Sequence, residues 1–187
     1  MRSHSLLYMV LALVSSLATD AHSQQRVTTP QLSEKELAAE LQEATDLMHK
    51  FANSNSEEEL TKLTRELIAP KEICEKVFTK EMASTLAEAY REAYDKGDLV
   101  IAGKPGQTVV KLTAASTDDL IGWTGSAAEH LAGGWKRMGK FVHPGYRIYT
   151  IKFLKPGEEL GMRFDGLTKV DGKWYIFPKA WRLAPEG

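Results

Sequence analysis

The stretch Val170-Asp171-Gly172-Lys173 constrains the fold more than any other part of the sequence, because it places Asp-Gly between two apolar runs. A two-residue type I′ turn needs positive φ at both central positions, which Asp-Gly tolerates well. We therefore predict a β-hairpin with a fixed register. Its facing pairs are Val170 with Lys173, Thr168 with Tyr175, Gly166 with Phe177, Phe164 with Lys179, and Met162 with Trp181.

A second turn lies upstream at Lys155-Pro156-Gly157-Glu158, where proline and glycine are typical of a type II turn. Type II turns match the twist of a hairpin poorly, so we expect a loop wider than two residues. Apolar side chains meet across these strands in only one parity. That parity pairs Phe153 with Leu160, Ile151 with Met162 and Tyr149 with Phe164, giving a three-stranded meander over 146–154, 160–170 and 173–181.

Strand alternation divides the side chains of the meander between two faces. The first face carries one charge, Lys179, and is expected to form a core or a pocket; its other members are Tyr149, Ile151, Phe153, Leu160, Met162, Phe164, Tyr175, Phe177 and Trp181. The second face is mixed, so we expect it to be partly wet or to meet a partner. Its members are Ile148, Thr150, Lys152, Arg163, Asp165, Leu167, Lys169, Trp174 and Ile176.

The first residues have the layout of a secretory signal peptide. Arg2 and His4 precede an apolar run, Leu6 to Leu17, and a small-x-small triplet follows at Ala21-His22-Ser23, with Ser16-Leu17-Ala18 as an alternative cleavage site. The run is shorter than the roughly 20 apolar residues that span a bilayer, and no later run approaches that length. We predict a signal peptide at 1–23, export to the periplasm or medium after cleavage near Ser23, and no transmembrane anchor in the mature chain.

Residues 24–32 are predicted to be a polar linker, and residues 33–187 a single α+β domain. A chain of this length can bury roughly 70% of its unfolded surface in one core. The net charge of −1 gives no electrostatic footprint for nucleic acid or an anionic membrane. Cys74 is the only cysteine, which excludes an intramolecular disulfide, and its helical neighbours predict that it is a small buried side chain.

Helix signals arrive in series after the linker. Ser33 with Glu36, and Ser56 with Glu59, have capping-box spacing and predict two helix starts, separated by a break at Asn53-Ser54-Asn55. A short helix is predicted over 70–78 and a longer one over 79–96, closed by Gly97 at the position after the C-cap. Their apolar stripes are expected to form core.

The region between these helices and the meander is predicted to contain one strand and two short helices. Residues 107–115 alternate, with Val110, Leu112 and Ala114 on one side. Short helices are predicted over 126–131, ended by Gly133-Gly134, and over 135–142.

The sequence contains no clear motif for a metal site, an anion site or a hydrolase. No cofactor or catalytic residue is assigned. His49, His130 and His143 stand on separate elements without metal-ligand spacing, so no metal site is predicted. Gly133-Gly134 followed by Lys136, Arg137, Lys140 and His143 is a weak anion-site pattern, also explained as a solvated turn with a basic helix end. No Gly-x-Ser-x-Gly motif is present.

Asp165 is unexpected because it is a carboxylate in the middle of a strand. A catalytic carboxylate needs a desolvated site to raise its pKa. The register places Asp165 on the mixed face, diagonally near Thr150 and Lys152 and close to Pro178. We interpret it as an exposed cross-strand partner, with a catalytic base as the alternative.

The order of elements resembles the NTF2-like, cystatin-related α+β cone. The end of the chain is also similar to uncharacterised exported bacterial proteins, through Leu160-Gly161-Met162-Arg163-Phe164-Asp165-Gly166, Val170-Asp171-Gly172-Lys173-Trp174-Tyr175 and Phe177-Pro178-Lys179-Ala180-Trp181-Arg182. The NTF2-like resemblance implies N-terminal helices packed on a curved antiparallel sheet, with a pocket at its open end. Enzymes of that family place an Asp or His inside the cone, and this chain has neither at a matching position.

Three hypotheses follow. The first is an exported, non-catalytic protein that binds a small apolar or amphipathic ligand, or a protein partner, through Tyr149, Phe164, Tyr175, Phe177 and Trp181, although these residues are equally expected to pack the helices. The second is an acid–base enzyme that uses Asp165 with Tyr149 or Tyr175. The third is a homodimeric scaffold joined through Ile148, Leu167, Trp174 and Ile176.

Overall fold

The computed structural model describes residues 32–185. The predicted signal peptide at 1–23 lies outside the described residues, as does the predicted linker except for Leu32. Within residues 32–185, no helix combines the length and the apolar character needed to cross a bilayer.

Four helices precede the sheet, close to their predicted bounds: α1 (Glu34–Asn53), α2 (Glu57–Glu66), α3 (Lys71–Val77) and α4 (Lys80–Asp95). The capping box at the start of α1 is complete, because the Ser33 hydroxyl accepts from Glu36 N and the Glu36 carboxylate accepts from Ser33 N. At α2 only half of the box forms. The Glu59 carboxylate instead accepts from the Ser54 hydroxyl at 2.7 Å.

The sheet and its short helices follow in this order: β1 (Val109–Ser116), α5 (Thr117–Gly122), α6 (Gly125–His130), the 3₁₀ helix η1 (Gly133–Lys140), β2 (Arg147–Leu154), β3 (Gly161–Val170), β4 (Lys173–Ile176) and the 3₁₀ helix η2 (Ala180–Arg182). Helix α5 was not predicted. Its start is a Ser116 cap, whose hydroxyl accepts from Asp119 N at 3.0 Å.

The four strands form one antiparallel sheet in the order β1-β2-β3-β4, which confirms the α+β class. The Asp-Gly hairpin has the predicted register at Val170 with Lys173 and at Thr168 with Tyr175. The pairing does not continue to Phe164 with Lys179 or Met162 with Trp181, and this part of the prediction is wrong. Pro178 has no N–H to donate, and the chain turns away from β3 into η2 at the next residue.

The β2–β3 hairpin is shifted by two residues from the predicted register. Phe153 faces Met162 and Ile151 faces Phe164, which leaves Leu160 exposed in the loop. A shift of two residues keeps the same side chains on the same face. The parity of Tyr149, Ile151, Met162 and Phe164 is therefore as predicted, although their partners are not.

A β-bulge at Gly166 overturns the predicted faces beyond it. Thr150 faces Asp165, whereas the preceding residue of β2, Tyr149, faces Leu167, so Gly166 is an extra residue in β3. Gly166 has φ +111°, and a Cβ there would lie 2.3 Å from the Phe177 carbonyl oxygen. The bulge exchanges the later residues between the two faces. Leu167, Lys169, Trp174 and Ile176 share the face of Tyr149, while Tyr175 and Phe177 lie on the face of Asp165.

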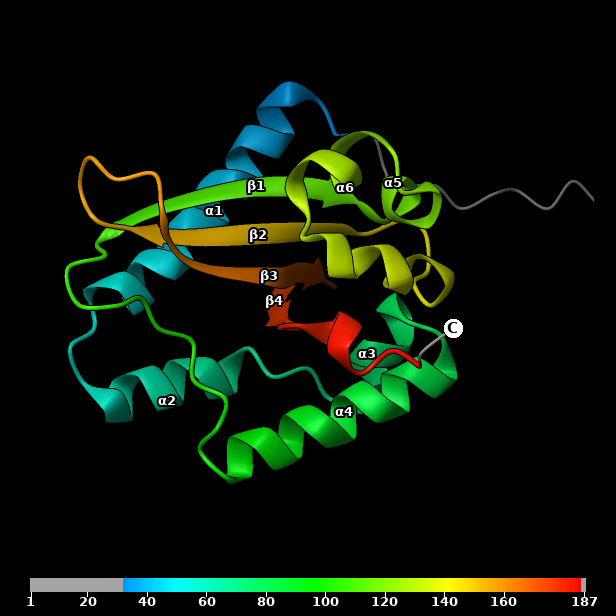
Figure 1. The fold of residues 1–187 in the computed structure, drawn as a ribbon, viewed down its shortest axis with the longest axis horizontal. Coiled ribbons are helices and arrows are strands. Elements are labelled where there is room, and N and C mark those ends of the chain that lie inside the picture. Colours follow the sequence, from blue (N-terminus) through cyan, green and yellow to red (C-terminus); the bar gives the residue numbers. More distant parts are fainter. Residues whose placement is uncertain (1–31, 186–187) are drawn as a thin grey trace, which may run out of the picture.

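The exchange produces two cores, one on each side of the sheet. Figure 1 shows α1 behind the sheet, with α5, α6 and η1 in front of it. The core beneath α1 contains Ala44, Met48, Phe51, Leu67, Ile101, Val110, Tyr149, Ile151, Phe153, Leu167, Trp174 and Ile176. The core on the other side joins α3, α4, η1 and η2, and includes Cys74, Phe78, Leu86, Trp135, Ile148 and Phe177.

Cys74 is fully buried, as predicted, and burial raises the pKa of its thiol to about 12. The outer edge of β4 is also covered. Ile176 N donates to Leu67 O at 2.9 Å, and Ile68 forms a parallel bridge with Ile176.

Candidate functional site

The five residues predicted to line a ligand site do not share a cavity. Tyr149 and Phe164 lie on the α1 face, Tyr175 and Phe177 lie on the opposite face, and Trp181 lies in η2. Tyr149 and Phe177 are fully buried and pack against the helices. The structure therefore separates these residues at the Gly166 bulge.

The surface predicted for dimerisation is also inside the protein. Ile148, Leu167 and Ile176 are almost fully buried, and Trp174 is 7% exposed. Trp174 Nε1 donates to Glu43 Oε1 of α1 at 2.9 Å. These four side chains thus pack within the chain.

Two carboxylates of α1 satisfy the polar groups on the face that this helix covers. The Tyr149 hydroxyl donates to Glu40 Oε2 at 2.5 Å, and burial together with this hydrogen bond raises the pKa of Tyr149. Lys169 Nζ lies 2.5 Å from Glu43 Oε2 and lowers the pKa of Glu43. Sequence reasoning missed both carboxylates, because only the packing of α1 brings them to the sheet.

Asp165 lies on the face away from Tyr149, as predicted, but it is not an exposed side chain. It is 9% exposed, and its Oδ1 accepts from the Thr150 hydroxyl at 2.7 Å and from Arg163 Nε at 2.8 Å. Tyr175 shares this face, with its ring beneath Lys173 at the hairpin turn. Asp165 therefore acts as the buried anchor of Arg163.

Arg163 ends a row of three cations across the sheet. Lys111 of β1 faces Lys152 of β2, and Lys152 faces Arg163 of β3. Arg163 is paired with Asp165, whereas Lys111 and Lys152 form no ion pair within residues 32–185. Like charges directly opposite one another destabilise a sheet. We call these three residues the basic row.

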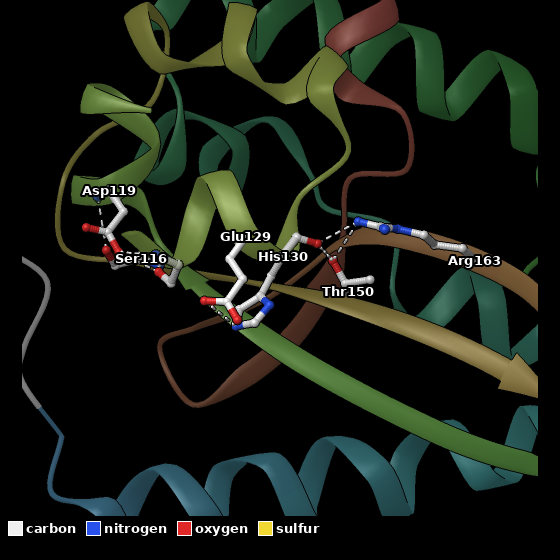
Figure 2. A network of polar contacts seen from close by, with 7 residues as sticks. Ser116, Asp119, Glu129, His130, Thr150 and Arg163 are labelled. Atoms are coloured by element: carbon white, nitrogen blue, oxygen red, sulfur yellow. Dashed lines mark hydrogen bonds and ion pairs between the residues drawn. The ribbon is translucent and has the colours of Figure 1, made fainter. Parts of the chain in front are cut away.

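The basic row borders a hollow of about 160 Å³ beside α6, which we call the first hollow; Leu112, Thr113, Glu129, His130 and Thr150 also line it. Figure 2 shows Arg163 and Thr150 converging on the main-chain carbonyl of His130. Arg163 Nη2 donates to this oxygen at 2.6 Å, and the Thr150 hydroxyl lies 3.1 Å from it. The hydrogen bonds hold the guanidinium against the sheet at the edge of the hollow.

A second network fixes α6, and with it the position of His130. Ser126 donates through its hydroxyl to Asp119 Oδ2 at 2.5 Å, and Ser116 N donates to the Ser126 hydroxyl at 3.1 Å. Figure 2 shows Ser116 and Asp119 side by side, on the far side of α6 from Arg163. A Cβ at Gly125 would lie 2.9 Å from Asp119 Oδ2, so the start of α6 approaches α5 closely.

A second hollow of about 230 Å³ adjoins the first at Arg163, and it has a more apolar lining: Ala132, Phe164, Pro178 and Trp181, with Asp165 and Lys179. A Cβ at Gly134 would lie 2.5 Å from Trp181 Cδ2, so glycine allows η1 to pack directly on the indole. Arg137 and Arg182 lie 5.9 Å and 5.2 Å from the Trp181 ring centroid. Gly134 thus supports an aromatic wall, a role that the anion-site pattern did not suggest. We call the two hollows together the Arg163 groove.

A larger hollow of about 780 Å³ lies between α4 and the α2–α3 connection. Its lining contains three basic residues and three acidic ones: Arg65, Lys71 and Arg91, and Glu72, Glu88 and Asp95. Arg65 lies over the Tyr94 ring at 5.9 Å. We assign the candidate site to the Arg163 groove because a buried carboxylate and a helix carbonyl orient its central cation.

The three histidines of the described chain do not meet. His49 lies in α1, His130 ends α6, and His143 lies in the loop before β2. Within residues 32–185, no group of three or more His, Cys, Asp or Glu side chains is arranged to hold a metal ion.

Comparison of the chain with protein-family models, with curated proteins and with solved structures gives no match. The candidate site therefore rests on its own geometry.

Proposed function

We propose that this protein is an exported, non-catalytic binding protein that holds a small amphipathic acid in the Arg163 groove. The observation that carries the proposal is the meeting of two unlike hollows at one oriented cation. The lysines of the basic row would bind the acidic group, and Ala132, Pro178 and Trp181 would contact the apolar part. A few placed polar groups beside an apolar wall are typical of small-molecule sites.

The unpaired lysines support an anionic ligand in particular. Lys111 and Lys152 face one another in register, so their charges repel when the groove is empty. An acidic group between them would relieve this repulsion and would add charge-assisted hydrogen bonds.

The proposal includes no catalytic step because Asp165 is already hydrogen-bonded within the protein. Its Oδ1 accepts from both Thr150 and Arg163, and the sheet separates it from the Tyr149 hydroxyl. A general base must reach the proton that it abstracts. Asp165 is positioned to hold Arg163 instead.

We also propose export after cleavage near Ser23 and an NTF2-like arrangement of the fold. The apolar run before Ala21-His22-Ser23 supports export. The NTF2-like proposal is supported by helices that precede a sequentially ordered antiparallel sheet. N-terminal sequencing of the protein recovered outside the host cytoplasm tests export, and a first residue at position 1 or 2 would contradict it.

The ligand proposal is tested by calorimetric titration of the chain from residue 24 with decanoate and, as an uncharged control, decanol. We expect binding of decanoate that weakens as salt is added, because salt screens the exposed lysines. Lys152→Gln should weaken decanoate binding about tenfold through loss of one charge-assisted contact. Lys62→Gln, on the exposed surface of α2, removes an equal charge and should change nothing.

Two results would overturn the proposal. One is no binding of decanoate by the wild-type protein. The other is equal loss of binding in Lys152→Gln and Lys62→Gln, which would assign any affinity to net charge. Trp181→Leu tests the apolar end, because it removes the indole and should weaken decanoate more than acetate.

A further inference from the structure

Lys179 occupies a backbone conformation that lysine rarely adopts. It has φ 53° and ψ 31°, in the left-handed region, where glycine and asparagine are favoured. The other residues besides glycine with positive φ among the described residues are Trp123 and Asp171. Asp171 belongs to the predicted hairpin turn, in which this conformation is expected.

The position of Lys179 suggests a role for its side chain. It follows the end of β4 and precedes η2, and it lines the second hollow together with Asp165 and Trp181. Its side chain is exposed and forms no ion pair within residues 32–185. Strained residues that persist at the wall of a hollow are associated with binding sites.

We infer that Lys179 determines the specificity of the Arg163 groove by binding a second acidic group, so that the preferred ligand is a small diacid with an apolar middle. This inference rests on the proposed function. The basic row would bind one acidic group at one end of the groove, and Lys179 would bind the other at the far end. Asp165 lies between them and would repel a ligand that is negatively charged in its middle.

The groove crosses the strands and runs on toward η2. Adjacent strands lie about 4.8 Å apart, so the basic row spans roughly 10 Å over three strands. The second hollow extends beyond β3 to η2. Decanedioate, an extended chain with a carboxylate at each end, is therefore a suitable probe. Decanoate has the same number of carbons and one carboxylate, which makes it the matched control.

The test measures binding of both probes by calorimetry, and the thermal midpoint, for wild type, Lys179→Gln, Lys179→Gly and the control Lys62→Gln. We expect wild type to bind decanedioate about tenfold more tightly than decanoate. Lys179→Gln and Lys179→Gly should both lose this preference while they keep the affinity for decanoate. Lys62→Gln should retain the preference, because Lys62 is an exposed residue of α2 that lines neither hollow.

The thermal midpoint distinguishes the effect of the Lys179 charge from the effect of its backbone conformation. Lys179→Gly should raise the thermal midpoint by about 2–4 °C, because glycine adopts positive φ without strain. Lys179→Gln keeps the strained backbone and should leave the midpoint unchanged.

Equal affinity of wild type for the two acids would overturn the inference and leave the proposed function standing. A preference that survives Lys179→Gln, or that disappears in Lys62→Gln, would also overturn it. Failure of wild type to bind either acid would instead contradict the proposed function itself.

Discussion

Charged side chains are paired on one face of the sheet and partly unpaired on the other. On the face beneath α1, Lys169 and Trp174 are both satisfied by one carboxylate, Glu43. On the other face, Lys111 and Lys152 stand opposite one another with no acidic partner in residues 32–185. Helix α1 covers the first face, whereas the short helices α5, α6 and η1 lie over the second (Figure 1). Part of the second face is hollow beside α6.

The comparison teaches which charges are structural. A charge that the fold itself pairs contributes to packing and holds a helix in place, as Glu43 does for α1. A like-charged pair left facing across strands is unfavourable in the empty protein, so it marks a surface where a ligand can supply the missing charge. Four predictions test this distinction.

Gly166→Ala should have the largest effect, because it attacks the bulge that separates the two faces. The new Cβ would lie 2.3 Å from the Phe177 carbonyl oxygen at φ +111°. We expect a loss of about 3 kcal/mol or more in the free energy of unfolding. Urea denaturation measures it. Gly157→Ala is the control, since it has φ +81° and open space around it, and should cost about 1 kcal/mol. Equal losses would show that the close approach at Gly166 is unimportant.

Tyr149→Phe should have an intermediate effect by breaking a contact between α1 and the sheet. The substitution keeps the ring but removes the hydroxyl that donates to Glu40 at 2.5 Å. We expect a loss of about 1–2 kcal/mol, because the hydrogen bond joins a partly buried pair that includes a charged group. Tyr94→Phe in α4 is the control and should be neutral within about 0.5 kcal/mol. If Tyr149→Phe left the free energy of unfolding unchanged, the hydrogen bond to Glu40 would not contribute to the docking of α1.

Glu43→Gln should change the free energy of unfolding by a smaller amount, which depends on pH. The pKa of Glu43 in the folded protein is lowered by the hydrogen bond from Lys169, so the pair stabilises the fold above the ordinary glutamate pKa and is lost as pH falls through the lowered value. Glu43→Gln should therefore flatten the decline in stability on acidification below about pH 4.5. The difference should stay below about 1 kcal/mol, because the Glu43 side chain is 49% exposed.

Urea denaturation between neutral and acid pH measures this change, with Glu158→Gln in the β2–β3 loop as the control. An identical pH profile for wild type and Glu43→Gln would contradict the role given to Glu43.

Lys152→Glu should have the smallest effect and the opposite sign. It places a carboxylate between Lys111 and Arg163, so it should raise the free energy of unfolding by about 0.5 kcal/mol while decanoate binding falls. Lys155→Glu, in the β2–β3 loop, is the control and should not stabilise the fold. A destabilised Lys152→Glu would mean that the basic row is not a site of repulsion.

Local chemistry made much of the fold predictable. The Ser33 and Ser56 caps mark the starts of α1 and α2, Gly97 has positive φ just past α4, and Asp171-Gly172 fixes the last hairpin. In each case neighbouring residues determine the structure. The side of β1 that carries Val110, Leu112 and Ala114 also follows from alternation, since these residues face α1.

The candidate site was less predictable because it depends on one inserted residue. A glycine inside a strand is a sign of a bulge, but alternation alone does not show that the register shifts there, and the shift moves Tyr175 and Phe177 to the other face. The end of β4 could have been anticipated from Pro178, which cannot donate to the ladder. The pairing of Asp165 with Arg163 could also have been found, because residues two apart on a strand share a face.

The bridge between Ile176 and the segment after α2 affects how this protein meets other molecules. Because Leu67 occupies the outward amide of Ile176, β4 does not offer that amide as a template for an incoming strand. The segment after α2 thus covers this edge of the sheet, which disfavours edge-to-edge pairing with a strand of another molecule.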